Sequence, residues 1–198
     1  MALKKIGLLG GSFDPVHRAH IALATAARDS LLLDEVQLIP AADPWQRAPL
    51  KATARQRCDM LRLAMQAQPK LVINLIEIER GGKTYTIDTL ESLPRNAQYF
   101  WVLGTDQLAN FCSWHRWEDI LIYAHLVVAK RPGTALEAPA PLQYLLDTLK
   151  KPIIELPFEP MPVSATHIRN AIASKTAIES FVDPAVEQYI QQHRLYQS

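Results

Sequence analysis

The residues best suited to chemistry lie near the start of the chain, in the string GGSFDPVHRAH that runs from Gly10 to His20. Gly10 and Gly11 have no side chains, so the backbone there can approach a bulky anion closely. His17 and His20 are three residues apart, which places both imidazoles on one face of an entering helix. A helix start favours anions, and two imidazoles can stabilise phosphate oxygens as charge develops in a transition state. The string, with the Ser12 hydroxyl, therefore predicts a polyphosphate site.

Other known phosphate loops do not account for this string. It contains neither GxGxxG, the dinucleotide fingerprint, nor GxxxxGK[ST], the Walker loop. A single histidine here would be read as a helix cap or a surface residue. The combination of two glycines, Pro15 and two spaced histidines after an apolar run favours a functional loop.

Two later segments offer matching groups. Ser164 can cap a helix, Thr166 adds a hydroxyl in its first turn, and Arg169 lies about one and a half turns further on. The Arg169 guanidinium can pair with phosphate, although a serine in such a place is often only a cap. Gly104 and Asp106 follow an apolar run, so Asp106 is either an ordinary cap or a ligand contact at the end of a strand. Its position favours the ligand contact.

Composition limits the class of protein. The 198 residues are 48% hydrophobic with a net charge of +1, which suits one core and argues against bulk binding to nucleic acid or membrane surfaces. The two cysteines, Cys58 and Cys112, form no CxxC or zinc spacing, so we predict free thiols and no protein-built metal site. We find neither a signal peptide nor an apolar stretch long enough to cross a bilayer, and we expect a cytoplasmic protein.

The elements that must position these groups alternate along the chain. Strands are predicted over 5–10, 35–40, 71–78, 99–104, 126–130 and 153–156. Helices are predicted over 18–32, 53–66, 86–93, 114–123, 142–149 and 184–192, with a helical patch at 106–111 and another helix beginning at Ser164. This order predicts an α/β fold with a Rossmann-like, doubly wound parallel sheet and helices on both faces. We expect one domain over 1–198 with a small C-terminal helical part, and ligands beyond the carboxyl ends of the strands.

The motifs resemble those of a known family. GGSFDPVHRAH is similar to the HxGH signature of the nucleotidyltransferase superfamily, and within it to that of the bacterial nicotinate-nucleotide adenylyltransferases. VSATHIR, from Val163 to Arg169, resembles the second signature, ISSTxIR. The resemblance extends from Lys5 to Tyr196. One departure is Ala19, which stands where the family has glycine between the histidines.

This resemblance implies a reaction. ATP and nicotinate mononucleotide would give nicotinate adenine dinucleotide and pyrophosphate, with Mg²⁺ arriving on ATP. The implied catalytic residues are His17 and His20. The implied ATP and phosphate contacts are Gly10, Gly11, Ser12, Phe13, Arg47, Gly104, Asp106, Ser164, Thr166 and Arg169. The implied nicotinate mononucleotide contacts are Tyr85, Thr86, Trp114, His115 and Arg131.

The resemblance also implies how the second substrate is recognised. Trp114, in SWHRWED, would stack on the pyridine ring, and backbone amides near Thr86 and His115 would bind the carboxylate. Trp117 is expected to pack into the core. Arg131 follows LVVAK in a string that is similar to the family's RRP. In PAADPWQRA, Gln46 stands where relatives have histidine, whereas Arg47 keeps the usual positive charge.

Three alternatives stay open at this point. One is another superfamily member, such as a phosphopantetheine adenylyltransferase, although such chains are shorter and lack SWHRWED and KTYTIDTL. Another is an enzyme that uses nicotinamide mononucleotide. The third is a non-catalytic nucleotide sensor on the same scaffold. The presence of both histidines beside Ser164 and Arg169 speaks against a sensor. The sequence does not indicate an oligomeric state.

Overall fold

A six-stranded parallel sheet forms the centre of the computed structural model, which describes residues 3–44 and 49–197. The strand order is β3-β2-β1-β4-β5-β6, the order of a doubly wound Rossmann-like sheet, and every neighbouring pair is parallel. The strands are β1 Lys4–Gly11, β2 Glu35–Pro40, β3 Leu71–Ile73, β4 Ala97–Gly104, β5 Ala124–Lys130 and β6 Ile154–Pro157. The predicted fold class is confirmed.

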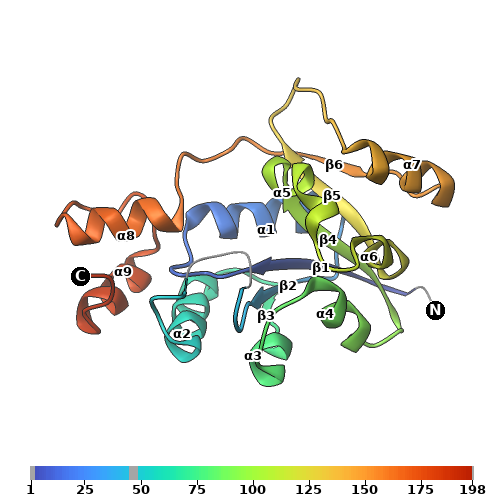
Figure 1. The fold of residues 1–198 in the computed structure, drawn as a ribbon. Coiled ribbons are helices and arrows are strands. Elements are labelled where there is room, and N and C mark those ends of the chain that lie inside the picture. Colours follow the sequence, from blue (N-terminus) through green and yellow to red (C-terminus); the bar gives the residue numbers. More distant parts are fainter. Residues whose placement is uncertain (1–2, 45–48, 198) are drawn as a thin grey trace.

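Helices connect the strands and lie on both sides of the sheet; Figure 1 shows α1 and α4 on opposite sides. The α-helices are α1 Arg18–Ser30, α2 Ala54–Met65, α3 Ile76–Arg80, α4 Thr86–Ser92, α5 Thr105–Ala109, α6 Trp117–Tyr123, α7 Ala140–Leu149, α8 Ala165–Ala173 and α9 Pro184–Gln192. A short 3-10 helix, η1, spans Phe111–Ser113. No helix in the described ranges combines the length and the apolar character that a membrane span requires.

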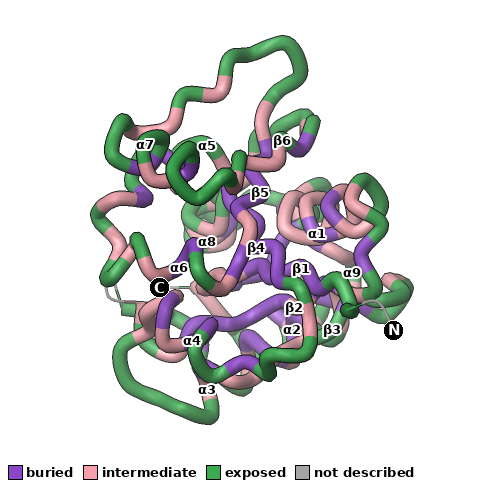
Figure 2. The backbone as a smooth tube through the Cα atoms, turned by 90° about the vertical axis from the view of Figure 1, so that its right-hand side faces the viewer, coloured by how far each residue is buried: buried purple, intermediate pink, exposed green. Residues whose placement is uncertain are grey.

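The central strands are buried on both faces, as the tube in Figure 2 shows for β1 and β4. Alternate residues of β4 belong to two different clusters of apolar side chains. Phe100 and Val102 join a cluster with α1, α2, α8 and α9, whereas Trp101 and Leu103 join one with α4 to α7. The buried runs of the sequence thus form strands because both of their faces have helices to pack against.

One predicted strand is wrong over most of its length. Only the first three residues of 71–78 form β3, and the chain then enters α3 at Ile76. The Asn74 side chain accepts a hydrogen bond from the backbone N–H of Ile76 at 3.0 Å, which satisfies a donor at the helix start. A short apolar run is compatible with a strand or with a helix, so the spacing of apolar residues in this segment did not identify the helix.

The predicted helix 114–123 begins later, at Trp117. Arg116 has a φ of 51°, a left-handed conformation that interrupts a helix between the η1 turn and α6. Other boundaries agree closely with prediction, and β2 and α9 have the predicted limits.

Candidate active site

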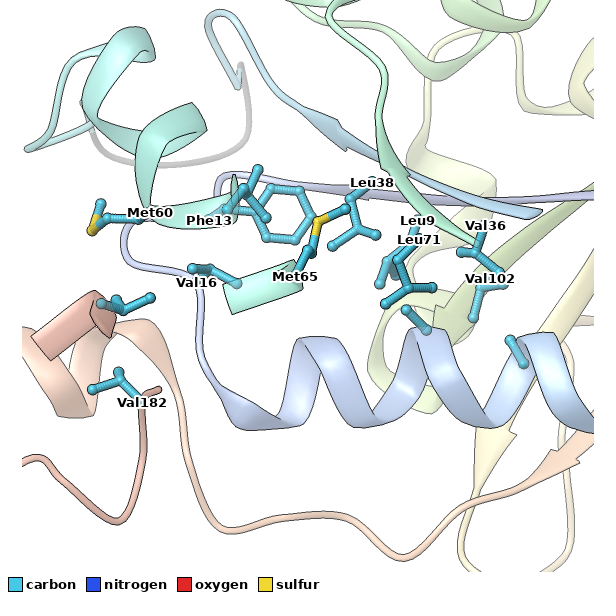
Figure 3. Close-up of a cluster of buried hydrophobic side chains, with 14 of the residues drawn as sticks. Leu9, Phe13, Val16, Val36, Leu38, Met60, Met65, Leu71, Val102 and Val182 are labelled. Carbon is cyan, nitrogen blue, oxygen red and sulfur yellow. The ribbon is translucent and has the colours of Figure 1, made fainter. Parts of the chain in front are cut away.

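The loop after β1 is shaped by close packing around its glycines. A Cβ atom on Gly11 would lie 3.0 Å from the ring of Phe13, and one on Gly10 would lie 3.1 Å from Trp101. The Phe13 ring is fully buried, and Figure 3 shows it among Leu38, Met60 and Met65. Glycine is therefore needed here for packing as well as for the approach of a ligand. Because the Phe13 side chain belongs to the core, only its backbone is available to a phosphate.

His17 and His20 stand together at the start of α1. His17 is the N-cap residue, and its backbone N–H donates to Nδ1 of His20 at 3.2 Å. The two imidazole rings stack with centroids 3.7 Å apart. Since Nδ1 of His20 accepts a hydrogen bond, its neutral ring carries the proton on Nε2, where it can be donated to a ligand. The predicted placement of both rings on one face is confirmed.

The two histidines differ in their surroundings. The His17 ring is buried, and this desolvation lowers its pKa from 6.5 to about 4. It is therefore neutral at neutral pH and can act as a hydrogen-bond donor rather than as a fixed positive charge. Within the described part of the chain, Nδ1 of His17 has no hydrogen-bond partner. A buried polar atom without a partner is costly, so it is a candidate contact for a ligand.

A cavity of about 330 Å³ opens beyond the carboxyl ends of β1, β2 and β4. It is lined by four residues predicted to contact ATP, namely Gly10, Gly11, Ser12 and Asp106. It is also lined by four predicted to contact the mononucleotide, namely Tyr85, Thr86, Trp114 and His115. The rings of Tyr85 and His115 lie 4.6 Å apart at the rim. The fold thus brings residues from 10 to 115 around one space, where such sheets bind ligands.

Comparison with known proteins identifies the family. The model of the cytidylyltransferase-like family matches residues 8–171. A relative from Bordetella parapertussis, named as a probable nicotinate-nucleotide adenylyltransferase, is 55% identical over 99% of this chain and 100% of its own length. A Bordetella petrii relative of the same name is 54% identical over 98% of this chain and 100% of its own. The chain belongs to the nicotinate-nucleotide adenylyltransferase family.

Solved structures agree on the fold. A Plasmodium falciparum nicotinic acid mononucleotide adenylyltransferase, solved in complex with NaAD, matches with a TM-score of 0.74 at 20% sequence identity. The match covers 98% of this chain and 97% of the Plasmodium chain. The same enzyme complexed with APC has a TM-score of 0.73 at 21% identity and covers 98% of this chain, with 97% of its own chain matched. The Rossmann-like fold is therefore shared with nicotinate-nucleotide adenylyltransferases far more distant in sequence.

The second motif of this family member packs against the first. Ser164 caps α8 as predicted, accepting a hydrogen bond from the His167 N–H at 3.1 Å. The Arg169 guanidinium donates to the carbonyl of Asp14 at 2.7 Å and to Oγ1 of Thr166 at 3.1 Å. Arg169 thus lies beside the loop of residues 12–17 between β1 and α1, which we call the phosphate loop after its predicted role, and supports its backbone.

The remaining predicted residues do not line this cavity in the described part of the chain. Gly104 is the N-cap of α5, next to Asp106, and Trp117 packs edge-on to Phe111 near the core, as predicted. The Arg131 side chain is 65% exposed, lies 3.9 Å from Glu159 and is not among the residues that line the cavity. Arg47 lies outside the described residues.

Three buried charged residues were missed by sequence reasoning. Arg57 of α2 donates to the carbonyls of Ser12 at 2.8 Å and Ala41 at 2.7 Å, so it ties two loops at the cavity together. Asp14 and Glu77 are each 3% exposed. The only available signal for Arg57 was its place beside apolar residues on an amphipathic helix. The burial of Glu77 at the cavity was not predicted, because its segment was predicted to be a strand and not a helix.

Glu77 lines the cavity and accepts a hydrogen bond from Oγ1 of Thr89 at 2.7 Å. Burial raises its pKa from 4.5 to about 7, with the Thr89 hydrogen bond and the nearby Arg80 and Arg57 charges opposing that rise. Oγ1 of Thr89 also accepts a hydrogen bond from Arg80 at 3.1 Å. The cavity therefore has a carboxyl group on its wall that changes charge near neutral pH.

We expect Glu77→Gln to alter how stability depends on pH. The folded chain keeps this proton up to about pH 7, whereas the unfolded chain releases it near 4.5, so the wild-type free energy of unfolding falls as pH rises between these values. The glutamine variant lacks this decline. Its stability relative to wild type should therefore rise by up to about 3 kcal/mol between acidic and mildly alkaline pH. Urea unfolding at about pH 5 and about pH 8 measures the difference.

His17 has the opposite effect, since its lowered pKa makes stability rise with pH between about 4 and 6.5. That contribution is common to wild type and variant, so it cancels in the comparison. Glu79→Gln, on the exposed side of the same helix, is the matched control and should show no such difference. Equal pH profiles for wild type and Glu77→Gln would contradict a raised pKa.

Proposed function

We propose that this chain transfers the adenylyl group of ATP to nicotinate mononucleotide, giving nicotinate adenine dinucleotide and pyrophosphate in NAD biosynthesis. The observation that carries the proposal is that one cavity at the strand ends is lined by both sets of predicted contacts. Residues predicted for ATP and residues predicted for the mononucleotide line the same space, so two substrates can meet there. The name of the family's close relatives agrees with this reaction.

The chemistry requires mainly alignment and charge stabilisation. The phosphate of the mononucleotide is already a competent nucleophile, and it attacks the α-phosphorus of ATP in line as pyrophosphate leaves. In our proposal His17 and His20 donate hydrogen bonds to the phosphate chain at the start of α1. Because the low pKa of His17 keeps it neutral, its contribution is a directed N–H group, not a net charge. No covalent intermediate is needed.

The other predicted residues are proposed to contact either the mononucleotide or ATP. Trp114 stacks on the pyridine ring, and backbone N–H groups near Thr86 and His115 bind its carboxylate. Asp106 contacts the nucleotide from the same cavity wall. Ser164, Thr166 and Arg169 contact the phosphates of ATP from the start of α8. We keep Arg47 and Arg131 as basic residues for phosphate or substrate, to be tested directly.

Magnesium is proposed to enter with ATP, held by phosphate oxygens and water. Among the residues that the structure describes, no three or more histidine, cysteine, aspartate or glutamate side chains are grouped as metal ligands. We propose a cytoplasmic location, which suits the free thiols of Cys58 and Cys112.

The test is pyrophosphate release with ATP and magnesium, comparing nicotinate mononucleotide, nicotinamide mononucleotide and phosphopantetheine as acceptors. We expect strong preference for nicotinate mononucleotide. Preference for another acceptor would keep the histidine chemistry and overturn the assigned substrate. The absence of release with every acceptor would favour a nucleotide sensor, with Ala19 and Gln46 as the first positions to examine.

A further inference from the structure

The phosphate loop is joined to the C-terminal end of the chain. The hydroxyl of Tyr196 donates to Oδ1 of Asp14 at 2.7 Å, across 182 residues of sequence. Asp14 lies in GGSFDPVHRAH, three residues before His17, and its side chain is almost fully buried. Tyr196 comes from the turn after α9, in the C-terminal part that lies beside α8 in Figure 1.

Asp14 organises more than one segment. Its carboxylate also accepts hydrogen bonds from the backbone N–H groups of Lys51 at 2.7 Å and Ala52 at 3.1 Å, before the start of α2. Its carbonyl accepts from Arg169 of α8 at 2.7 Å. The single residue thus connects the phosphate loop with three separate segments, and Tyr196 supplies the contact from the C-terminus.

The Tyr196 hydroxyl is a well-defined donor. The side chain is partly buried and packs against the same apolar cluster as Phe13 and Val16 of the loop. Burial, followed by the hydrogen bond and the charge of Asp14, raises the pKa of Tyr196, so the hydroxyl stays protonated throughout the neutral range. A hydrogen bond to a buried carboxylate is among the stronger kinds, and it restrains both partners.

We propose that Tyr196 is a positioning residue that acts through Asp14 to hold the phosphate loop, and with it His17 and His20, in the geometry needed for transfer. The proposal rests on the proposed function, because that function gives the loop its role. Loss of the hydroxyl leaves the loop its local turns but removes one restraint on its orientation. A small misplacement of catalytic groups is enough to slow a reaction strongly.

The test is Tyr196→Phe, which removes only the hydroxyl. We expect kcat to fall about tenfold, while KM for nicotinate mononucleotide stays within about twofold, because Trp114 and its neighbours are not held by this contact. Amide hydrogen exchange of residues 12–17, measured without substrate, should become faster.

Tyr189→Phe is the matched control. Tyr189 packs against the same apolar cluster, and its hydroxyl contacts an aspartate, Asp59 of α2, at 3.3 Å, which is not part of the loop. The Tyr189→Phe variant should lose about as much stability as Tyr196→Phe. It should nevertheless keep the wild-type kcat and the wild-type rate of amide exchange in residues 12–17. Equal kcat values for the two variants, or unchanged exchange in Tyr196→Phe, would overturn the positioning role. Since exchange needs no substrate, an inactive wild type would reject the proposed function separately.

Discussion

Replacing His20 with alanine is expected to lower kcat about a hundred- to a thousand-fold, with much smaller changes in KM for either substrate. His20 stands in the first turn of α1, and its Nδ1 accepts a hydrogen bond from the His17 backbone N–H, so its neutral ring carries the proton on Nε2. A donor that acts mainly on charge developing in the transition state affects turnover more than ground-state binding. Steady-state kinetics of pyrophosphate release, with each substrate varied in turn, measures both quantities.

His20→Gln separates catalysis from helix capping. Glutamine at the third helical position can return a hydrogen bond to the backbone of the N-cap residue, so the helix start should survive. We expect this variant to retain near wild-type stability while kcat remains strongly reduced. A loss confined to ATP affinity in His20→Ala would contradict the transition-state role.

Replacing Arg57 with methionine is expected to lower the free energy of unfolding by about 2–6 kcal/mol, because two backbone carbonyls lose their donor at about 1–3 kcal/mol each. Arg57 is 1% exposed, and its guanidinium holds the carbonyls of Ser12 and Ala41. Methionine fills similar space but donates no hydrogen bond. Urea unfolding of variant and wild type measures the loss.

Arg55→Met is the control on the same helix. The Arg55 side chain is 92% exposed and lies 4.0 Å from Asp59, so its replacement should change the unfolding free energy by no more than about 0.5 kcal/mol. Equal effects at positions 55 and 57 would show that the two carbonyl contacts of Arg57 do not stabilise the fold.

Much of the architecture could be predicted from local patterns. The buried runs of β1 and β4 and the alternation of strands with helices determined the parallel sheet, because strands covered on both faces need continuous apolar residues. The Ser164 cap was also predictable, since a serine oxygen satisfies a helix N–H within three residues. The candidate site could be located because the ends of parallel strands gather at one edge.

The sequence by itself therefore determined the parallel sheet, most of the helices and the edge of the sheet where the candidate site lies. Only the tertiary structure decided that Arg57 supports the loop, that Tyr196 contacts Asp14, and that Glu77 lies on the cavity wall. Local patterns depend on interactions within a few residues. The hydrogen bonds of Arg57 to Ser12 and of Tyr196 to Asp14 join residues that are 45 and 182 positions apart, and only the packed chain determines which distant group satisfies each buried charge.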